Sequence, residues 1–328
     1  MRMIRSLLLT VLLVFVCALS SYAQSAGDTG GGRTSWGAPD LQGVWYFNTN
    51  VPLERPRDEA ERKAAATQAG PDWRAPDVPP DGDVGAYNAF WVDIASDGKQ
   101  RPSQITDPSD GRIPELIAGV EVQFGSLYAD HPQERPIRYR SGGAGTAGPE
   151  DRGIAERCII GFNTGPPMVP IGYNNNMQLF QGEDYVAILN EMVHDVRIIP
   201  MDGRPHLPDG IRQWMGDARG HWEGDTLVVE TQNFTGKTSS FSPHITRAIG
   251  SGENMNLVER FTRTDKETLH YEYTVTDPST FTRPFTAAIP MAATDGHIYE
   301  YACHEGNLGL ENILRGAREE EAARAAQQ

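Results

Sequence analysis

The chain has 328 residues, of which 29 are Lys or Arg and 44 are Asp or Glu, so its formal net charge is −15. An acidic protein repels phosphate backbones and anionic lipids, which argues against nucleic acid or a membrane surface as a partner. Beyond the N-terminal segment, no apolar stretch approaches the ~20 residues that span a bilayer.

The first residues predict a secretory signal peptide over 1–23. Arg2 and Arg5 precede an apolar run from Leu7 to Leu19, and small residues stand before an expected cut near Ala23. An anchor at Cys17 is the weaker alternative, because Val16 is a poor residue before a lipidated cysteine. We therefore expect a periplasmic or secreted protein, whose mature chain carries 27 basic and 44 acidic residues, a net charge of −17.

The mature chain is expected to form one β-rich domain. A Gly/Ser-rich flexible leader covers 24–36, the domain covers 37–316, and 317–328 is expected to be an exposed helix or a frayed tail. The part at 37–157 is rich in loops and partly helical. In it we expect a strand entering at 43–47, a helix at 57–66, a strand at 86–94, a turn at 107–111 and helical structure at 114–129.

The part at 158–316 has the pattern of a β-meander. Short runs rich in β-branched and aromatic residues are separated by turns such as Glu223-Gly224-Asp225, Thr264-Asp265-Lys266 and Asp277-Pro278-Ser279. The runs are 177–180, 185–189, 196–199, 226–230, 257–261 and 268–275. This spacing predicts a mainly β fold, an antiparallel meander or barrel. The chain has no glycine-rich nucleotide-binding motif and no GxSxG motif between a strand and a helix.

Cys158 and Cys303 are the two cysteines left after the signal peptide is removed. In an oxidising compartment an even pair favours one disulfide over two buried free thiols. Two cysteines are too few for a structural zinc site or an iron–sulfur cluster made of cysteines.

Two polar segments stand out as candidate site regions. The stretch from Asn190 to Asp225 holds three histidines and four arginines among hairpin-like runs, and 299–305 reads Tyr-Glu-Tyr-Ala-Cys-His-Glu on what we expect to be another strand. Although distant in sequence, the two segments are expected to converge on one pocket.

His194 is the first candidate general base, because an imidazole titrates near neutral pH. If 185–200 is one strand, alternation places Asn190 and His194 on one face and Asp195 and Arg197 on the other. A break near 191–193 would change this partition. Asp195 and Arg197 are then expected to form a structural ion pair, while Asp195 also remains a candidate partner for the catalytic histidines.

His206 lies in a loop stiffened by Pro205 and Pro208, which could aim its ring into a cavity or merely cap a turn. His304 and Glu305 follow Cys303 directly, so a disulfide would hold them rigidly. His194, His206 and His304 lack the spacing of a zinc site, so a divalent metal is not favoured and no cofactor is expected.

Substrate contacts are expected from residues near these histidines. His221 and Glu223 share a face if their segment is extended, and the Asn174-Asn175-Asn176 run offers amides that could bind hydroxyls or simply form a turn. The predicted set is Asn175, Arg212, Trp214, His221 and Glu223.

Motifs along the chain resemble a large family of exported bacterial proteins of unassigned function. The blocks that carry the resemblance are PDLQGVW (39–45), PLERP (52–56), DPSDGRIP (107–114), ERCIIGFNTGPPM (156–168), YNNNMQLFQ (173–181), NEMVHDVRIIPMDGRPHLP (190–208), RQWMGDARGHWEGDTLVVETQNF (212–234), LVERFTR (257–263) and YEYACHEGN (299–307). The resemblance implies a single evolutionary unit and brings no reaction with it. In addition, Gly43, Trp45 and Tyr46 resemble the first-strand signature of lipocalins and their calycin relatives, which is a short pattern that a core tryptophan also explains.

Three functions fit these residues. The leading hypothesis is an exported enzyme acting on a small organic molecule by acid–base chemistry, through His194, His206 and His304 with Glu305 or Asp195, in a hydrolysis, elimination or isomerisation. The second is a binding protein for an apolar or aromatic ligand, its cavity lined by Trp45, Trp91, Trp214 and Tyr273. The third is a carbohydrate-active protein that uses the Asn run. The sequence leaves the substrate and the oligomeric state open.

Overall fold

In a computed structural model the described residues are 32–49, 51–59, 101–120, 123–124, 146–171, 173–236, 239–244, 247–251 and 253–327. The expected signal peptide, most of the leader, nearly all of the helix at 57–66 and the strand at 86–94 lie outside these ranges.

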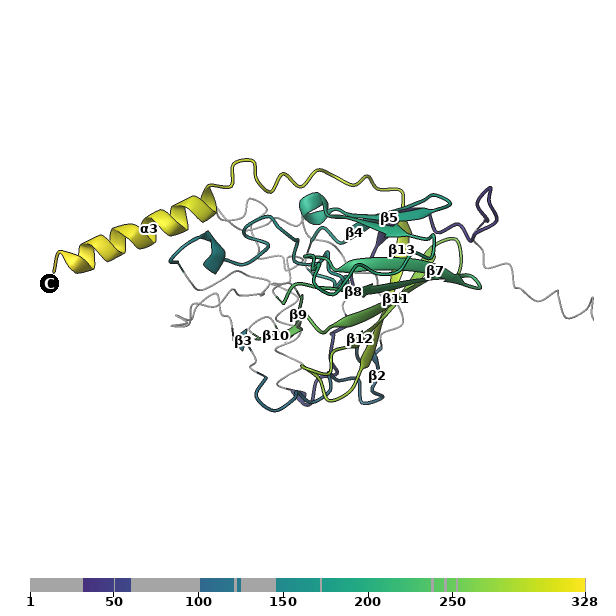
Figure 1. Ribbon diagram of the computed structural model, residues 1–328, viewed down its shortest axis with the longest axis horizontal. Helices are drawn as coiled ribbons and strands as arrows, with labels where there is room; N and C mark the ends of the chain where they lie inside the picture. The colour runs from purple at the N-terminus through teal and green to yellow at the C-terminus, as the bar shows by residue number, and fades with distance from the viewer. Residues whose placement is uncertain are drawn as a thin grey trace, which may run out of the picture.

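One antiparallel sheet dominates the described residues (Figure 1). Its strand order is β6-β5-β4-β1-β13-β12-β11-β8-β7, and β2 pairs with β13. The strands are β1 (Gly43–Tyr46), β2 (Ile105–Asp107), β4 (Asn176–Gln181), β5 (Tyr185–Asn190), β6 (Val196–Pro200), β7 (Asp217–Glu223), β8 (Thr226–Gln232), β11 (Asn256–Arg263), β12 (Thr268–Thr276) and β13 (Phe285–Thr294). The prediction of a mainly β meander is confirmed.

The remaining described elements are small, with one exception. A second sheet joins β3 (Gln123–Phe124), β10 (Arg247–Ser251) and β9 (Ser239–His244), and two 3-10 turns, η1 (Pro149–Asp151) and η2 (Met192–His194), lie in loops. Helix α3 (Leu308–Ala325) follows the last strand and extends away from the sheet (Figure 1). No helix in the described ranges is both long and apolar enough to cross a membrane.

The sheet is curved but not closed into a barrel. Its end strands β6 and β7 lie next to each other without forming a ladder. Gly220 of β7 makes this approach possible, because a Cβ there would stand 2.9 Å from Cγ2 of Ile199 on β6. The sequence allowed either a meander or a barrel, and the structure has the meander.

Alternating side chains explain why these segments pair as strands. In β12, Leu269, Tyr271, Tyr273 and Val275 are buried while the residues between them are partly exposed, as a sheet with one face on the core requires. The inward residues of neighbouring strands form one apolar core that also contains Trp45.

A charged group lies inside that core. Arg197 of β6 donates two hydrogen bonds to Glu259 of β11, at 3.1 and 2.6 Å, and both side chains are buried. Tyr271 donates to the same carboxylate at 2.7 Å. The expected ion pair between Asp195 and Arg197 is therefore wrong, because Arg197 is paired with Glu259 while Asp195, in the turn before β6, accepts from Gly161 and Thr164.

Three further expectations need correction. The segment 114–120 is not helical; instead Leu116 forms a bridge with Phe281, which ties this segment to the loop before β13. Residues 299–305 form an extended segment and turn outside the sheet rather than a strand. The run 185–200 is two strands, β5 and β6, separated by η2.

Candidate functional site

A pocket lies between the loop after η1 and the C-terminal segment that leads into α3. Its volume is about 540 Å³, within the range of small-molecule sites. The lining residues are Ala155, Glu156, Phe162, Tyr173, Glu300, Tyr301, Ala302, Cys303, Glu305, Gly306, Asn307, Gly309, Leu310 and Ile313.

A small second core supports the inner wall of this pocket. Cys158, Met192 and Val193 are buried there, and Phe162, Ile171, Tyr173, Tyr301 and Cys303 pack against them. The expected disulfide between Cys158 and Cys303 is present, with the two Cα atoms 5.7 Å apart. It fixes the C-terminal segment to the loop that carries Phe162.

Gly161 lets this loop approach η2. A Cβ at Gly161 would stand 2.7 Å from Cγ of Met192 and 2.8 Å from Cγ2 of Thr164, closer than real Cβ contacts. The backbone N–H of the next residue, Phe162, points at Sδ of Met192 at 3.1 Å. The ring of Phe162 is therefore placed by close packing of the backbone.

The turn between β5 and β6 contacts the C-terminal segment, which forms the opposite wall of the pocket, through Glu191 and His194. Glu191 is only 4% exposed and accepts from the backbone N–H of Tyr299 at 3.2 Å and from Asn176 at 2.8 Å. His194 Nδ1 lies 3.2 Å from the carbonyl oxygen of Tyr301. The two polar segments singled out in the sequence thus meet, but they meet at the side of the pocket.

The contact with Tyr301 indicates the tautomer of the neutral His194 ring. A carbonyl oxygen only accepts, so Nδ1 carries the proton and Nε2 of the neutral ring keeps its lone pair. The ring is exposed. Val193 and His194 have φ of 60° and 46°. β-branched residues avoid this region, so the conformation of Val193 costs about 1–3 kcal/mol. This strained turn is the structure that directs His194 at the C-terminal segment.

Asp195 forms hydrogen bonds with the loop that carries Phe162. One carboxylate oxygen, Oδ2, accepts from the backbone N–H of Gly161 at 2.9 Å and from the hydroxyl of Thr164 at 2.8 Å. Burial raises the pKa of Asp195, and these two hydrogen bonds offset the effect only in part. Asp195 positions a loop and has no contact with His206 or His304 in the described structure.

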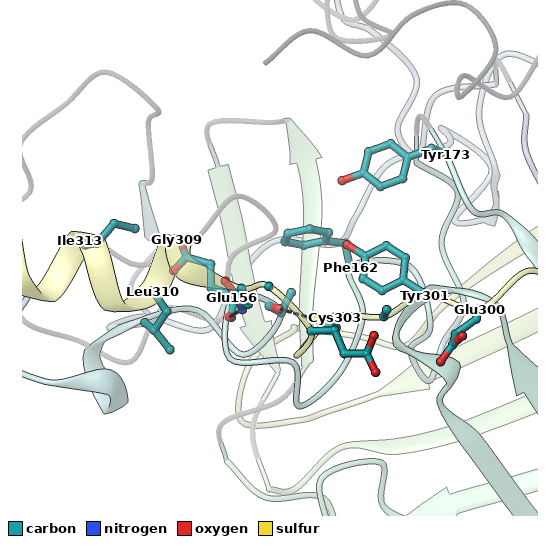
Figure 2. Close-up of a pocket in the computed structure, with 14 residues that line it drawn as sticks. Glu156, Phe162, Tyr173, Glu300, Tyr301, Cys303, Gly309, Leu310 and Ile313 are labelled. Carbon is teal, nitrogen blue, oxygen red and sulfur yellow. Dashed lines mark hydrogen bonds between the residues drawn. The ribbon is translucent and has the colours of Figure 1, made fainter. Parts of the chain in front are cut away.

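The pocket combines aromatic rings with carboxylates. Figure 2 shows Phe162, Tyr173 and Tyr301 at one part of the lining, and Leu310 and Ile313 of α3 at the other. Glu156 is paired with Arg152 at 2.9 Å. Glu300 and Glu305 have no partner among the residues that the structure describes, so the side-chain charges they bring to the lining are not neutralised.

His206 lies elsewhere, at the far end of β6. Its Nδ1 is 3.0 Å from Oδ2 of Asp217, which also accepts from the backbone N–H of Leu207 at 2.9 Å, while Arg219 bonds Oδ1 at 2.6 Å. Burial alone would raise the pKa of Asp217, but these hydrogen bonds outweigh burial and lower it. A carboxylate accepts from Nδ1, so Nε2 of neutral His206 keeps the lone pair.

The three candidate histidines do not form one cluster. His194 precedes β6 and His206 follows it, and the strand between them advances about 3.3 Å per residue over 196–200. The exposed side chain of His304 makes no hydrogen bond within the described part of the chain. No group of three or more His, Cys, Asp or Glu able to hold a metal ion occurs among the described residues.

The expected substrate-binding residues are dispersed. Asn175 is fully buried and bonds both the N–H (2.8 Å) and the carbonyl (2.6 Å) of Ile171, so its amide is occupied by the protein's own backbone. Arg212 bonds Glu253 at 3.1 Å, and Trp214 is half-buried.

His221 and Glu223 share a face of β7, as expected, and lie 3.3 Å apart. Hydrogen bonds from Arg260, at 2.6 Å, and from His221 lower the pKa of Glu223. This group lies on the exposed outer side of the sheet.

Of the aromatic residues predicted to line a cavity, Trp45, Trp214 and Tyr273 are absent from the lining in the described part of the chain. Trp45 and Tyr273 are buried in the main core, and Trp91 lies outside the described residues. Phe162 and Tyr173, which do line the pocket, were not predicted. Their only signal in the sequence is position, since both follow Cys158 within 15 residues and the disulfide brings that loop to Tyr301.

Compared with protein-family models, with curated proteins and with solved structures, the chain gives no match.

Proposed function

We propose that this chain is an exported binding protein for a small aromatic molecule, which it holds in the pocket beside the disulfide. The observation that carries the proposal is a cavity of about 540 Å³ whose lining combines Phe162, Tyr173 and Tyr301 with a few polar groups. A cavity of this volume is within the range of small-molecule sites, and its lining is more polar than apolar.

The construction of the walls supports the proposal. The disulfide, the buried Glu191 and the close packing at Gly161 fix both sides of the pocket before a ligand arrives. A preformed site loses little conformational entropy on binding, so more of the contact energy appears as affinity. Export is supported by the disulfide together with the signal-like N-terminus.

The test is a ligand-observed NMR screen with small phenols and anilines that are neutral, cationic or anionic. We expect binding that the Tyr301→Ala variant weakens at least about tenfold, because burying an aromatic ring contributes roughly 1.5–3 kcal/mol. Tyr301→Phe, which retains the ring, should retain binding. Tyr299→Ala is the matched control, since Tyr299 is 70% exposed and outside the lining.

Two results would contradict this function. One is the absence of binding by every compound in the screen. The other is binding that Tyr301→Ala and Tyr299→Ala weaken to the same extent, with both variants folded by thermal melting, which would place the ligand elsewhere.

A second candidate function is an acid–base enzyme centred on His206. The observation that favours it is the hydrogen bond from Nδ1 to Asp217, which fixes the tautomer and orients Nε2, as a general base requires. On this proposal His206→Ala abolishes turnover of small esters or lactones without lowering the melting temperature, while His221→Ala leaves turnover intact. Turnover that survives His206→Ala excludes this candidate.

A further inference from the structure

We propose that the pocket selects an organic cation, namely an aromatic or aliphatic ammonium group, over neutral and anionic molecules of the same shape. This inference rests on the proposed binding function and adds the charge of the ligand. It follows from the types of side chain in the lining, where the described residues include no cationic side chain.

The ring faces are the first part of the argument. Phe162, Tyr173 and Tyr301 all line the cavity and pack on the same small core (Figure 2). The face of an aromatic ring carries partial negative charge, so it attracts an ammonium group within about 6 Å of its centre. Several rings around one cavity are the arrangement that holds alkylated ammonium ions in proteins.

The carboxylates are the second part. Glu156, Glu300 and Glu305 line the cavity, whereas no Lys, Arg or His is among its lining residues in the described structure. Glu156 is already neutralised by Arg152, which leaves Glu300 and Glu305 as two uncompensated negative charges. Both residues are exposed, so their attraction for a cation acts partly through water and is screened by salt.

The partial positive charge at the N-terminus of α3 opposes cation binding. Asn307 precedes the helix, and Gly309 and Leu310 of its first turn line the pocket. A helix N-terminus is equivalent to roughly +0.5 of an elementary charge. Two full carboxylate charges exceed this value, and the net charge of the whole chain, −15, has the same sign as the carboxylates.

The experiment uses two probes of one shape. The cation is 4-(trimethylammonio)phenol, and 4-tert-butylphenol is its neutral isostere, with carbon in place of nitrogen. Titration calorimetry on the disulfide-bonded protein measures both dissociation constants at low and high salt. We expect the cation to bind at least about tenfold more tightly at low salt, and we expect high salt to reduce this preference.

Substitutions then locate the origin of the preference. The double variant Glu300→Gln and Glu305→Gln should weaken cation binding at least about fivefold and change binding of the neutral probe less than about twofold. Glu311→Gln is the matched control for charge: it removes one carboxylate from α3 at a position outside the lining, where the side chain is 68% exposed. It should change neither constant by more than about twofold.

The possible outcomes test cation selection and aromatic binding separately. Equal binding of the two probes, with sensitivity to Tyr301→Ala, overturns cation selection and leaves the aromatic-binding function standing. A preference for the cation that survives the double Glu→Gln substitution overturns the role of the carboxylates. If neither probe binds and the wider NMR screen also shows no ligand, both proposals fall.

Discussion

At the scale of single residues, the most unusual group is the ion pair inside the core. Arg197 and Glu259 are 4% and 0% exposed at their side chains, and Tyr271 donates to the same carboxylate. Burial would lower the pKa of Arg197, but the adjacent carboxylate outweighs burial and raises it. Burial and that same negative charge raise the pKa of Tyr271 well above its usual value, so it remains a donor.

Removing one member of this pair should be costly. We expect Arg197→Met to lower the free energy of unfolding by about 3–5 kcal/mol, because it leaves a carboxylate buried without its cation. The double variant Arg197→Met with Glu259→Gln should lose less, since no charge remains. Urea denaturation at neutral pH measures both. As a control, Arg283→Met breaks an exposed pair with Asp107 and should cost no more than about 1 kcal/mol; an equal cost for the two single variants would contradict the argument.

Asp195 predicts a dependence of stability on pH. Its pKa is raised in the folded protein by burial, so between the unfolded and folded pKa values the folded state binds more protons. Stability contributed at this position is therefore present at low pH and is lost as pH rises through the folded pKa. Asp195→Asn keeps an oxygen for Gly161 and Thr164 and cannot ionise.

The measurement for Asp195 is the difference in unfolding free energy between Asp195→Asn and the wild type, followed by urea denaturation from about pH 3.5 to pH 7. The difference should move in favour of the variant as pH increases. A difference that stays constant over this range would show that Asp195 has the same pKa in both states.

The sequence predicted which segments of the candidate site are polar, but it did not predict the tertiary contacts of their side chains. The polar residues at 190–195 and 299–305 were visible as unusual clusters, and the structure joins them through Glu191 with Tyr299 and His194 with Tyr301. The partner of each side chain was not predictable, because η2 breaks the strand and Val193 adopts positive φ, so alternation no longer assigns faces. Asp195 lies in the turn before β6 and bonds Gly161 and Thr164, a tertiary contact that no local pattern indicates.

At the scale of elements, the sequence predicted strands whose inward residues are large and apolar. The runs at 185–189, 257–261 and 268–275 are β5, β11 and β12. Several strands escaped this reasoning, among them β13 inside the main sheet and β7 at its end. In β13, small residues such as Ala287 and Ala288 are both buried and Pro290 interrupts the pattern, while β7 is polar along much of its length. Their positions are fixed by neighbours in the sheet and not by their own periodicity.

The contact between β6 and β7 gives a prediction at the same scale. Gly220→Ala would place a methyl group 2.9 Å from Cγ2 of Ile199, and we expect overpacking to cost about 1–3 kcal/mol. Thermal and urea unfolding measure the loss. Gly210→Ala is the control, because its Cβ would meet open space. If Gly220→Ala is as stable as the control, the end strands do not pack as closely as described.

At the scale of the whole molecule, the disulfide links the loop before β4 to the C-terminal segment that lines the pocket. It joins residues 145 positions apart, so its absence releases a long loop in the unfolded chain. Replacing both cysteines by serine should lower the free energy of unfolding by about 2–5 kcal/mol. Binding should weaken as well, because Cys303 lines the pocket and the disulfide anchors the segment that carries Tyr301. Adding a reductant tests directly whether the disulfide supports stability and binding. It should shift the unfolding midpoint and the ligand affinity of the wild type towards those of the serine variant. It should have no effect on the serine variant itself. A wild type whose stability and affinity are both unchanged on full reduction would show that the remaining contacts hold the segment in place without the disulfide.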